Sequence, residues 1–215
     1  MTLYDTLIDL LDAVKDLDRE IRFIDGEKEE SVLRFGELRD EALALLGALQ
    51  ERGMNAGDEL IIFSKSNRSF VIAFWAAVLG GIVPVPVAVG ISDEHKLKLF
   101  RILSQLDNPT LFTEMNELQR LVDYARDEKL NDILGLLETH AVLMRVVVAG
   151  AHGQIHDAQP DEIVFIQYSS GSTSDTMGVV LTHRFMCVNI RAFVEGFDWN
   201  DAERSLSWMP LTHDM

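Results

Sequence analysis

Apolar positions along the chain follow two periods that alternate from one end to the other. Short runs rich in Val, Ile, Leu and Phe, bounded by glycine, proline or polar residues, predict strands. Apolar residues spaced three and four apart predict amphipathic helices. The predicted strands cover residues 21–24, 32–35, 60–63, 82–87, 110–113, 142–148, 163–168 and 179–181, and another begins at 206–208. The predicted helices cover about 3–17, 37–52, 70–79, 92–106, 117–127, 131–137 and 183–196. This alternation indicates an α/β fold with a layered αβα arrangement, in which helices cover both faces of a sheet.

The longest uncharged run, residues 70–91, has enough residues to span a bilayer. Gly80 and Gly81 end any helix that starts near its beginning, and Pro84 and Pro86 cannot continue one. The helical part is then about ten residues, or ~15 Å against ~30 Å of hydrocarbon. We therefore expect a buried helix that turns into a strand, and no membrane span. The N-terminus has no basic region before an apolar stretch, so we expect no signal peptide.

Composition narrows the class of protein. At 215 residues the chain can form one large domain or two small lobes, and 47% hydrophobic with 25% charged residues is ordinary for a globular protein. A formal net charge of −16 opposes binding to nucleic acid and to anionic lipid surfaces. The single Cys187 excludes an internal disulfide framework and predicts a reducing, cytoplasmic location. Its apolar neighbours on a predicted helix favour a core thiol over a nucleophile.

A run of small hydroxylated residues and glycine lies between the strands at 163–168 and 179–181. Successive backbone N–H groups in such a turn form an anion-binding concavity, and the hydroxyls of residues 169–174 add donors. A phosphate-binding loop is one interpretation, and a solvated turn is the common alternative. The run is not a Walker loop, because six residues separate Gly171 from Gly178 and no Lys follows. A P-loop NTPase is therefore disfavoured.

Two other clusters carry weaker signals. His152 and His156 lie four residues apart, but Gly153 and Pro160 indicate a loop and no third ligand accompanies them, so a metal site is disfavoured. The basic residues of the 92–106 helix are interpreted as a solvated face; they are Lys96, Lys98 and Arg101.

The segment FIQYSSGSTSDTMGVVLTH, residues 165–183, resembles the phosphate-loop motif of the adenylate-forming (AMP-binding, ANL) superfamily. The chain ends in WMPLTHDM, which resembles a signature of the fatty acyl-AMP ligases within that superfamily. The similarity is closest to the N-terminal loading domains of iturin- and mycosubtilin-type lipopeptide synthetases. It implies the N-terminal part of the large domain of an adenylate-forming enzyme. Residues 1–160 would form an N-terminal subdomain, and 161–215 would start a second subdomain that is truncated here.

The resemblance also implies a reaction and its partners. Such a ligase activates a fatty acid with ATP and Mg²⁺ to acyl-AMP. It then transfers the acyl group to the phosphopantetheine of an acyl carrier protein in lipopeptide or polyketide biosynthesis, beside nonribosomal peptide and polyketide synthases. Coenzyme A is the alternative acceptor, as in a fatty acyl-CoA synthetase. The chain would need the remainder of the adenylation domain as a partner. No catalytic residue falls within the fragment, and the isolated fragment is expected to be inactive.

The resemblance assigns roles to individual residues. The ATP phosphates would be held by Ser169, Ser170, Gly171, Ser172, Thr173, Ser174 and Gly178, with Thr173 also placing Mg²⁺. His213 and Asp214 would lie beside the acyl-adenylate. Two departures weaken the assignment of activity: Ser174 stands where the family has Gly, and Thr176-Met177 replace Pro-Lys. Met177 cannot supply the positive charge of that Lys. A non-catalytic binding module with the adenylating fold is therefore the alternative.

Overall fold

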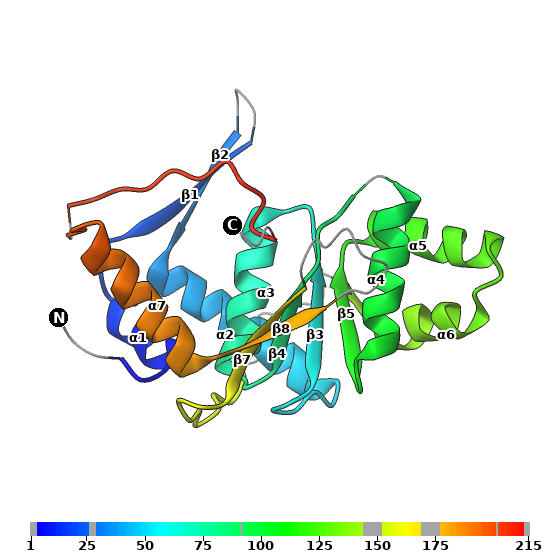
Figure 1. Cartoon of the computed structure of the whole chain (residues 1–215), viewed down its shortest axis with the longest axis horizontal. Helices are drawn as coiled ribbons and strands as arrows, with labels where there is room; N and C mark the ends of the chain where they lie inside the picture. Colours follow the sequence, from blue (N-terminus) through cyan, green and yellow to red (C-terminus); the bar gives the residue numbers. More distant parts are fainter. Residues whose placement is uncertain are drawn as a thin grey trace.

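The computed structural model describes residues 4–25, 29–90, 92–143, 152–168, 177–200 and 202–212 (Figure 1). The helices are α1 (Leu7–Val14), α2 (Phe35–Glu51), α3 (Asn67–Leu79), α4 (Asp93–Gln105), α5 (Met115–Asp127), α6 (Asn131–His140) and α7 (His183–Gly196). The strands are β1 (Glu20–Asp25), β2 (Glu29–Arg34), β3 (Glu59–Phe63), β4 (Val83–Pro86), β5 (Pro109–Thr113), β6 (Ala141–Leu143), β7 (Ile163–Tyr168) and β8 (Gly178–Thr182). The predicted α/β fold is confirmed.

The centre of the molecule is a parallel four-stranded sheet with the order β4-β3-β5-β6. The side chains of β3 alternate between its two faces. Leu60 and Ile62 belong to a core formed with α1, α2 and α3, whereas Ile61 and Phe63 belong to a second core formed with α4, α5 and α6. A strand that is buried on both faces reads as a continuous apolar run, which is why 60–63 could be recognised from the sequence. Figure 1 shows the two helical layers on either side of these strands.

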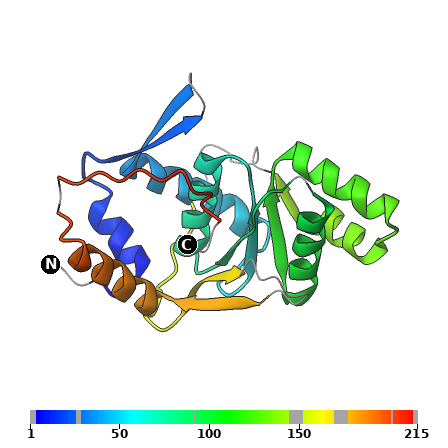
Figure 2. The ribbon, with the colours of Figure 1, turned by 45° about the horizontal axis from the view of Figure 1, so that its top comes forward.

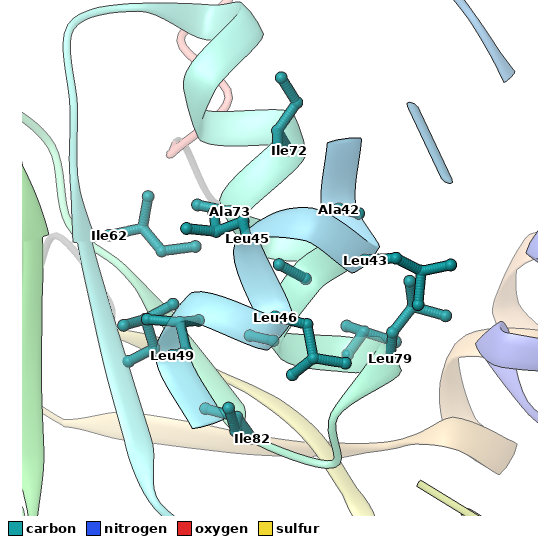
Figure 3. Packing of buried hydrophobic residues seen from close by; sticks show 14 of the residues in the cluster. Ala42, Leu43, Leu45, Leu46, Leu49, Ile62, Ile72, Ala73, Leu79 and Ile82 are labelled. Carbon is teal, nitrogen blue, oxygen red and sulfur yellow. The ribbon is translucent and has the colours of Figure 1, made fainter. Parts of the chain in front are cut away.

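Helices α2 and α3 form the densest part of the first core (Figure 3). Leu45, Leu46 and Leu49 of α2 are almost completely buried against the small side chains of α3 and against Ile62 of β3. Ala73, Ala76 and Ala77 have no exposed surface, so the two helix backbones can approach closely. Burial of each of these leucines contributes about 1.5–3 kcal/mol relative to its exposed state.

The uncharged run 70–91 divides as the sequence predicts. Helix α3 ends at Leu79, Gly80 follows, and Gly81 takes a φ of +65°, which favours glycine. The chain then forms β4 at the edge of the sheet. The N–H groups of Val83 and Val87 donate to the carbonyls of Asp58 and Ile62 at 2.8 and 3.1 Å. Pro84 and Pro86 alternate with these donors and therefore face away from β3, so their lack of an N–H costs the β3–β4 ladder no hydrogen bond. Among the described residues, no helix has both the length and the apolar character that a membrane span requires.

The segment 152–162 is an extended linker tied to the first helical layer, as predicted for the loop that contains His152 and His156. Gly153 N donates to Leu43 O of α2 and His156 N donates to Leu79 O of α3, both at 2.8 Å. These bonds carry the chain across the molecule and place β7 beside β4. Strands β7 and β8 form a separate antiparallel pair.

The prediction of a strand beginning at 206–208 is wrong: residues 203–208 have no regular secondary structure. An alternating apolar sequence forms a strand only where another strand supplies hydrogen bonds, and none among the described residues pairs with this segment. Of the strand predicted at 142–148, β6 is described as far as Leu143, and the rest lies outside the described residues. The N-terminal helix is shorter than predicted, because α1 ends at Val14.

Candidate functional site

The predicted phosphate-binding loop is framed by an antiparallel strand pair. Tyr168, the last residue of β7, is the register partner of Gly178, the first residue of β8. The chain therefore leaves the pair after Tyr168 and returns beside it. Residues 169–176, which contain the predicted phosphate ligands Ser169 to Ser174, lie outside the described residues. The structure describes the strands on which this loop is mounted.

Gly178 is required here for space. A β-carbon at this position would lie 2.9 Å from Ile166 Cγ2 and 3.2 Å from Tyr168 Cζ. Its φ is not in the left-handed region, so the close approach of the Ile166 and Tyr168 side chains, and not the backbone conformation, favours glycine here. Burial, and to a lesser extent the charge of Glu59, raises the pKa of Tyr168, so its hydroxyl stays protonated. A larger residue at position 178 would displace the Tyr168 ring from the end of β7, where the loop begins.

Strand β8 leads into α7 through a short polar junction. The side chain of Thr182 accepts a hydrogen bond from Phe185 N and caps the N-terminus of α7. His183 N and Arg184 N donate to the carbonyls of Glu162 and Pro160 at 3.2 and 2.8 Å. The first N–H groups of α7 are thus used within the fold and hold the end of the linker.

His183 connects this junction to the N-terminal helix. Its side chain is 2% exposed, and its Nδ1 accepts a hydrogen bond of 3.1 Å from Leu7 N, the first residue of α1. An acceptor at Nδ1 requires the neutral tautomer with its proton on Nε2. Burial lowers the pKa of His183, against the charges of Glu162 and Asp9. No role was predicted for this residue, because its partner lies 176 positions away in the sequence.

The segment after α7 doubles back across the molecule (Figures 1 and 2). It reaches β7, where Gln167 Nε2 donates to Thr212 O at 3.3 Å. Gln167 lies two positions before Ser169, and Thr212 immediately precedes His213. His213 and Asp214 themselves lie outside the described residues. The two segments that resemble the family's motifs are therefore attached at neighbouring points of the fold.

The described residues contain no cluster of three or more His, Cys, Asp or Glu able to hold a metal ion. Thr173, the predicted Mg²⁺ ligand, is outside the described residues. His156 Nε2 lies 2.8 Å from Glu162 Oε2, within hydrogen-bonding distance.

Cys187 agrees with its interpretation as a core residue, whereas Lys96 does not lie on the predicted solvated face, because its side chain is only 16% exposed. Cys187 packs against the first core, and burial raises the pKa of its thiol, as expected for a structural residue. Lys96 forms an ion pair with Asp93 at 2.8 Å and lies 4.3 Å from the centre of the Tyr124 ring. Its charge is thereby satisfied within the second helical layer.

A family model described as "AMP-binding enzyme" matches residues 13–215, almost the whole chain. The chain belongs to the AMP-binding family. Its match includes the linker, the β7–β8 pair, α7 and the returning C-terminal segment, so these features are parts of an adenylate-forming domain.

Among curated relatives, the chain is 27% identical over 161 residues to a long-chain-fatty-acid–AMP ligase of Mycolicibacterium smegmatis, covering 74% of this chain and 25% of that protein. It is 23% identical over 222 residues to a medium-chain-fatty-acid–acyl-carrier-protein ligase of Moorena producens, covering 98% of this chain and 36% of that protein. The chain spans between a quarter and about a third of the length of these relatives.

Solved AMP-binding structures share the fold. The adenylation domain of a keto acid-selecting nonribosomal peptide synthetase module, bound to a keto acyl adenylate, matches with a TM-score of 0.87 and 26% identity. That match covers 99% of this chain and 39% of the solved one. The fatty acid AMP ligase of Legionella pneumophila matches with a TM-score of 0.85 and 21% identity, over 99% of this chain and 36% of that one.

Proposed function

We propose that the chain is the N-terminal portion of a fatty acid–AMP ligase that loads a carrier protein. Family membership supports an adenylate-forming reaction. The observation that carries the proposal is that the two segments resembling family motifs, 165–183 and the C-terminal WMPLTHDM, are both anchored at the end of β7. Tyr168 is the register partner of Gly178, and Gln167 donates to the carbonyl of Thr212. Relatives named as fatty acid–AMP and fatty acid–acyl-carrier-protein ligases support the substrate class.

The proposed reaction has two steps, adenylation of the fatty acid and transfer of the acyl group to a thiol. An oxygen of the fatty acid carboxylate attacks the α-phosphorus of ATP, the bond to the β-phosphate oxygen breaks, and pyrophosphate leaves. A phosphopantetheine thiol then attacks the carbonyl carbon of acyl-AMP, loses its proton to form the thioester, and AMP departs. Catalysis of phosphoryl transfer depends on positioning and on stabilising charge on phosphate oxygens. Mg²⁺, when bound, neutralises part of that charge.

Residues of this chain would contribute binding and orientation. The hydroxyls and backbone N–H groups of Ser169, Ser170, Gly171, Ser172, Thr173 and Ser174 are proposed to hold the ATP phosphates. Thr173 is proposed to help place Mg²⁺. His213 and Asp214 are proposed to border the acyl-adenylate. The residue that protonates or stabilises the leaving pyrophosphate would come from the remainder of the domain.

Coenzyme A is the alternative acceptor. Relatives of this chain include proteins named as fatty-acid–CoA ligases, such as one of Mycobacterium tuberculosis at 24% identity over 208 residues. The two acceptors carry the same phosphopantetheine thiol, so they differ in what else the enzyme must contact. We favour the carrier protein because the terminal WMPLTHDM segment resembles the acyl-AMP ligases.

A non-catalytic module is a second candidate, and Ser174 with Met177 favours it. Met177, which immediately precedes β8, is 70% exposed and offers no charge to a triphosphate. In an active site that uses a Lys at this place, its loss would remove one charge-assisted contact to phosphate. A chain that kept only the fold would tolerate this substitution.

Fatty acid-dependent exchange of pyrophosphate into ATP, measured with the complete polypeptide that its gene encodes, tests the proposal. We expect exchange with at least one saturated fatty acid between C6 and C18 and none without a fatty acid. Absence of exchange with every chain length refutes the ligase. Adding a phosphopantetheinylated carrier protein or coenzyme A to separate reactions then identifies the acceptor from the thioester formed.

The substitutions Ser174→Gly and Met177→Lys, combined in that polypeptide, separate the two candidates. A degenerate nucleotide site regains exchange by orders of magnitude, whereas a fold recruited for binding alone stays inactive. Leu106→Ile, a conservative change at the end of α4, serves as the matched control and leaves exchange unchanged.

A further inference from the structure

Gln167 is the residue of β7 that faces the C-terminal segment, residues 202–212. Alternation along the strand puts it on the same side as Phe165, whose ring lies 5.6 Å from that of Phe74 on α3. Ile166 and Tyr168 point the other way and pack with the second core. The end of the described chain lies beside α3 in both ribbon views (Figures 1 and 2). The C-terminal segment therefore arrives on the side of β7 that carries Gln167.

The contact between Gln167 and this segment is a hydrogen bond with a fixed direction. Gln167 Nε2 lies 3.3 Å from the carbonyl oxygen of Thr212. A carbonyl can only accept, so the amide of Gln167 turns its nitrogen towards it and acts as the donor. The bond joins residues 45 positions apart and fastens the main chain of the C-terminal segment.

The C-terminal segment has few other attachments. Its remaining hydrogen bonds within the part of the chain that the structure describes stay among residues 200–209. Leu206 and Trp208 are 76% and 85% exposed, so they pack little against the rest of the molecule. Among the described residues, the bond from Gln167 is thus the one hydrogen bond that ties this segment to another element.

The predicted phosphate-binding loop is attached by other means. The chain leaves β7 after Tyr168 and returns at Gly178, and these two residues are held by the β7–β8 register and by burial of the Tyr168 ring. Backbone groups make that ladder, so it does not depend on the side chain of Gln167. A change in this side chain therefore acts on the C-terminal segment and leaves the strands that carry the loop in place.

We propose that Gln167 is a positioning residue, which holds the C-terminal segment against the end of β7 in the arrangement that binds the fatty acid. This inference rests on the proposed function, in which His213 and Asp214 border the acyl-adenylate. Thr212 directly precedes these two residues, so a displacement of its carbonyl moves the point from which they start. Gln167 acts through Thr212 and takes no part in making or breaking a bond of the substrate.

Removal of the donor should weaken binding of the fatty acid and leave the chemical step unchanged. A segment that is no longer held leaves the binding arrangement part of the time, and the apparent affinity falls in proportion to the fraction that stays competent. A neutral hydrogen bond is equivalent to about a two- to twelvefold change in an equilibrium constant. At 3.3 Å this bond is longer than the usual value of about 2.9–3.0 Å, so we expect about two- to fivefold.

Gln167→Met, made in the complete polypeptide that its gene encodes, tests the proposal, because Met has a similar length and no donor. Fatty acid-dependent exchange of pyrophosphate into ATP is measured with each substrate varied while the other is saturating. We expect KM for the fatty acid to rise about two- to fivefold, while KM for ATP and kcat stay at the wild-type values. Gln119→Met, at an exposed position of α5, is the matched control and should change none of the three.

Gln167→His is the rescue variant. At about pH 8 its imidazole is neutral, and an N–H at Nε2 lies close to the place of the amide nitrogen and can donate to the carbonyl of Thr212. It should recover at least half of the affinity for the fatty acid that the Met variant loses. Gln167→Ala also removes the donor and takes the place of the Met variant if that variant does not fold.

Hydrogen–deuterium exchange without substrates gives a readout that does not depend on activity. The backbone amides of the peptide that covers residues 202–212 should exchange at least about twofold faster in Gln167→Met than in the wild type. Peptides from β8 and α7 should keep their wild-type rates, because their ladder and helix bonds are unchanged.

The outcomes separate this inference from the proposed function. A wild type without exchange for any fatty acid refutes the proposed function, and the positioning role falls with it. With an active wild type, a KM for the fatty acid that changes no more in Gln167→Met than in Gln119→Met overturns the positioning role alone. Equal rises in KM for ATP and for the fatty acid overturn it as well, since they show a general structural effect. Unchanged deuterium exchange at 202–212 shows that the bond does not hold the segment.

Discussion

The hydrogen bond between Leu7 and His183 should make the attachment of α1 depend on an unprotonated imidazole. Replacing His183 with Leu keeps most of the buried volume but removes the acceptor, so the N–H of Leu7 stays buried without a partner. An unsatisfied buried donor costs about 1–3 kcal/mol. At roughly 3 °C per kcal/mol for a chain of this length, the melting temperature should fall by about 3–9 °C.

His183→Asn is the matched control. Its Oδ1 occupies a position close to that of Nδ1 and can accept from Leu7 N, so it should recover at least half of the loss seen with Leu. Thermal unfolding followed by circular dichroism measures both variants. Equal destabilisation by Leu and Asn would show that imidazole packing, rather than the hydrogen bond, holds α1.

The same bond predicts a pH dependence with a definite sign. Since burial holds the folded pKa of His183 below its ordinary value, the unfolded chain binds more protons as the pH falls below about 6.5. The stabilising contribution of His183 is therefore complete above about pH 6.5 and is lost as the pH falls through the folded pKa. Glu162, Asp9 and His156, which act on His183, are unchanged in the Asn variant.

The quantity to measure is the difference in unfolding free energy between the wild type and His183→Asn, from urea titrations between pH 5 and 8. We expect this difference to be constant above about pH 6.5 and to move in favour of Asn below it. A difference that stays flat over the whole range refutes a neutral acceptor at His183.

Three further substitutions probe the scaffold. Leu46→Ala should lower the unfolding free energy by about 2–5 kcal/mol in urea titrations, because Leu46 is fully buried between α2 and α3. Thr182→Ala should cost about 0.5–2 kcal/mol through loss of the α7 cap, and Thr182→Ser should retain most of it in the same assay. Gly81→Ala should lower the melting temperature more than Gly53→Ala does. Both have positive φ, but only at Gly81 would the new β-carbon meet the His156 ring, at 2.6 Å.

The elements with strong local signals were predictable from sequence. Residues 70–91 divided correctly into α3 and β4 because the pair Gly80-Gly81 is followed closely by Pro84 and Pro86, a combination that a helix does not continue through. The strand predicted at 206–208 does not form, because an alternating pattern of side chains does not by itself provide a neighbouring strand to pair with. For the site, the sequence predicted a loop between the two strands that the structure shows as β7 and β8.

Long-range relationships of the site could not be predicted. The hydrogen bond from Leu7 to His183 and that from Gln167 to Thr212 join residues far apart in sequence. No periodic pattern in the sequence predicts either bond. The reason for Gly178 was also inaccessible, because it depends on where the Tyr168 ring lies after folding. The predicted division at residues 160 and 161 stays a prediction, as do the roles of the ligands in the loop.

The prolines of β4 have a mechanical consequence. Pro84 and Pro86 face away from β3, at the outer edge of β4. Because proline has no N–H, that edge of the central sheet lacks backbone donors at both positions. β7 adjoins β4 but belongs to a different ladder. The contact between the two sheets is therefore made by side chains, and no backbone hydrogen bond among the described residues joins β4 to β7. Packing of Val164 in the first core and of Tyr168 in the second, and not a hydrogen-bond ladder, therefore fixes the β7–β8 pair against the first sheet.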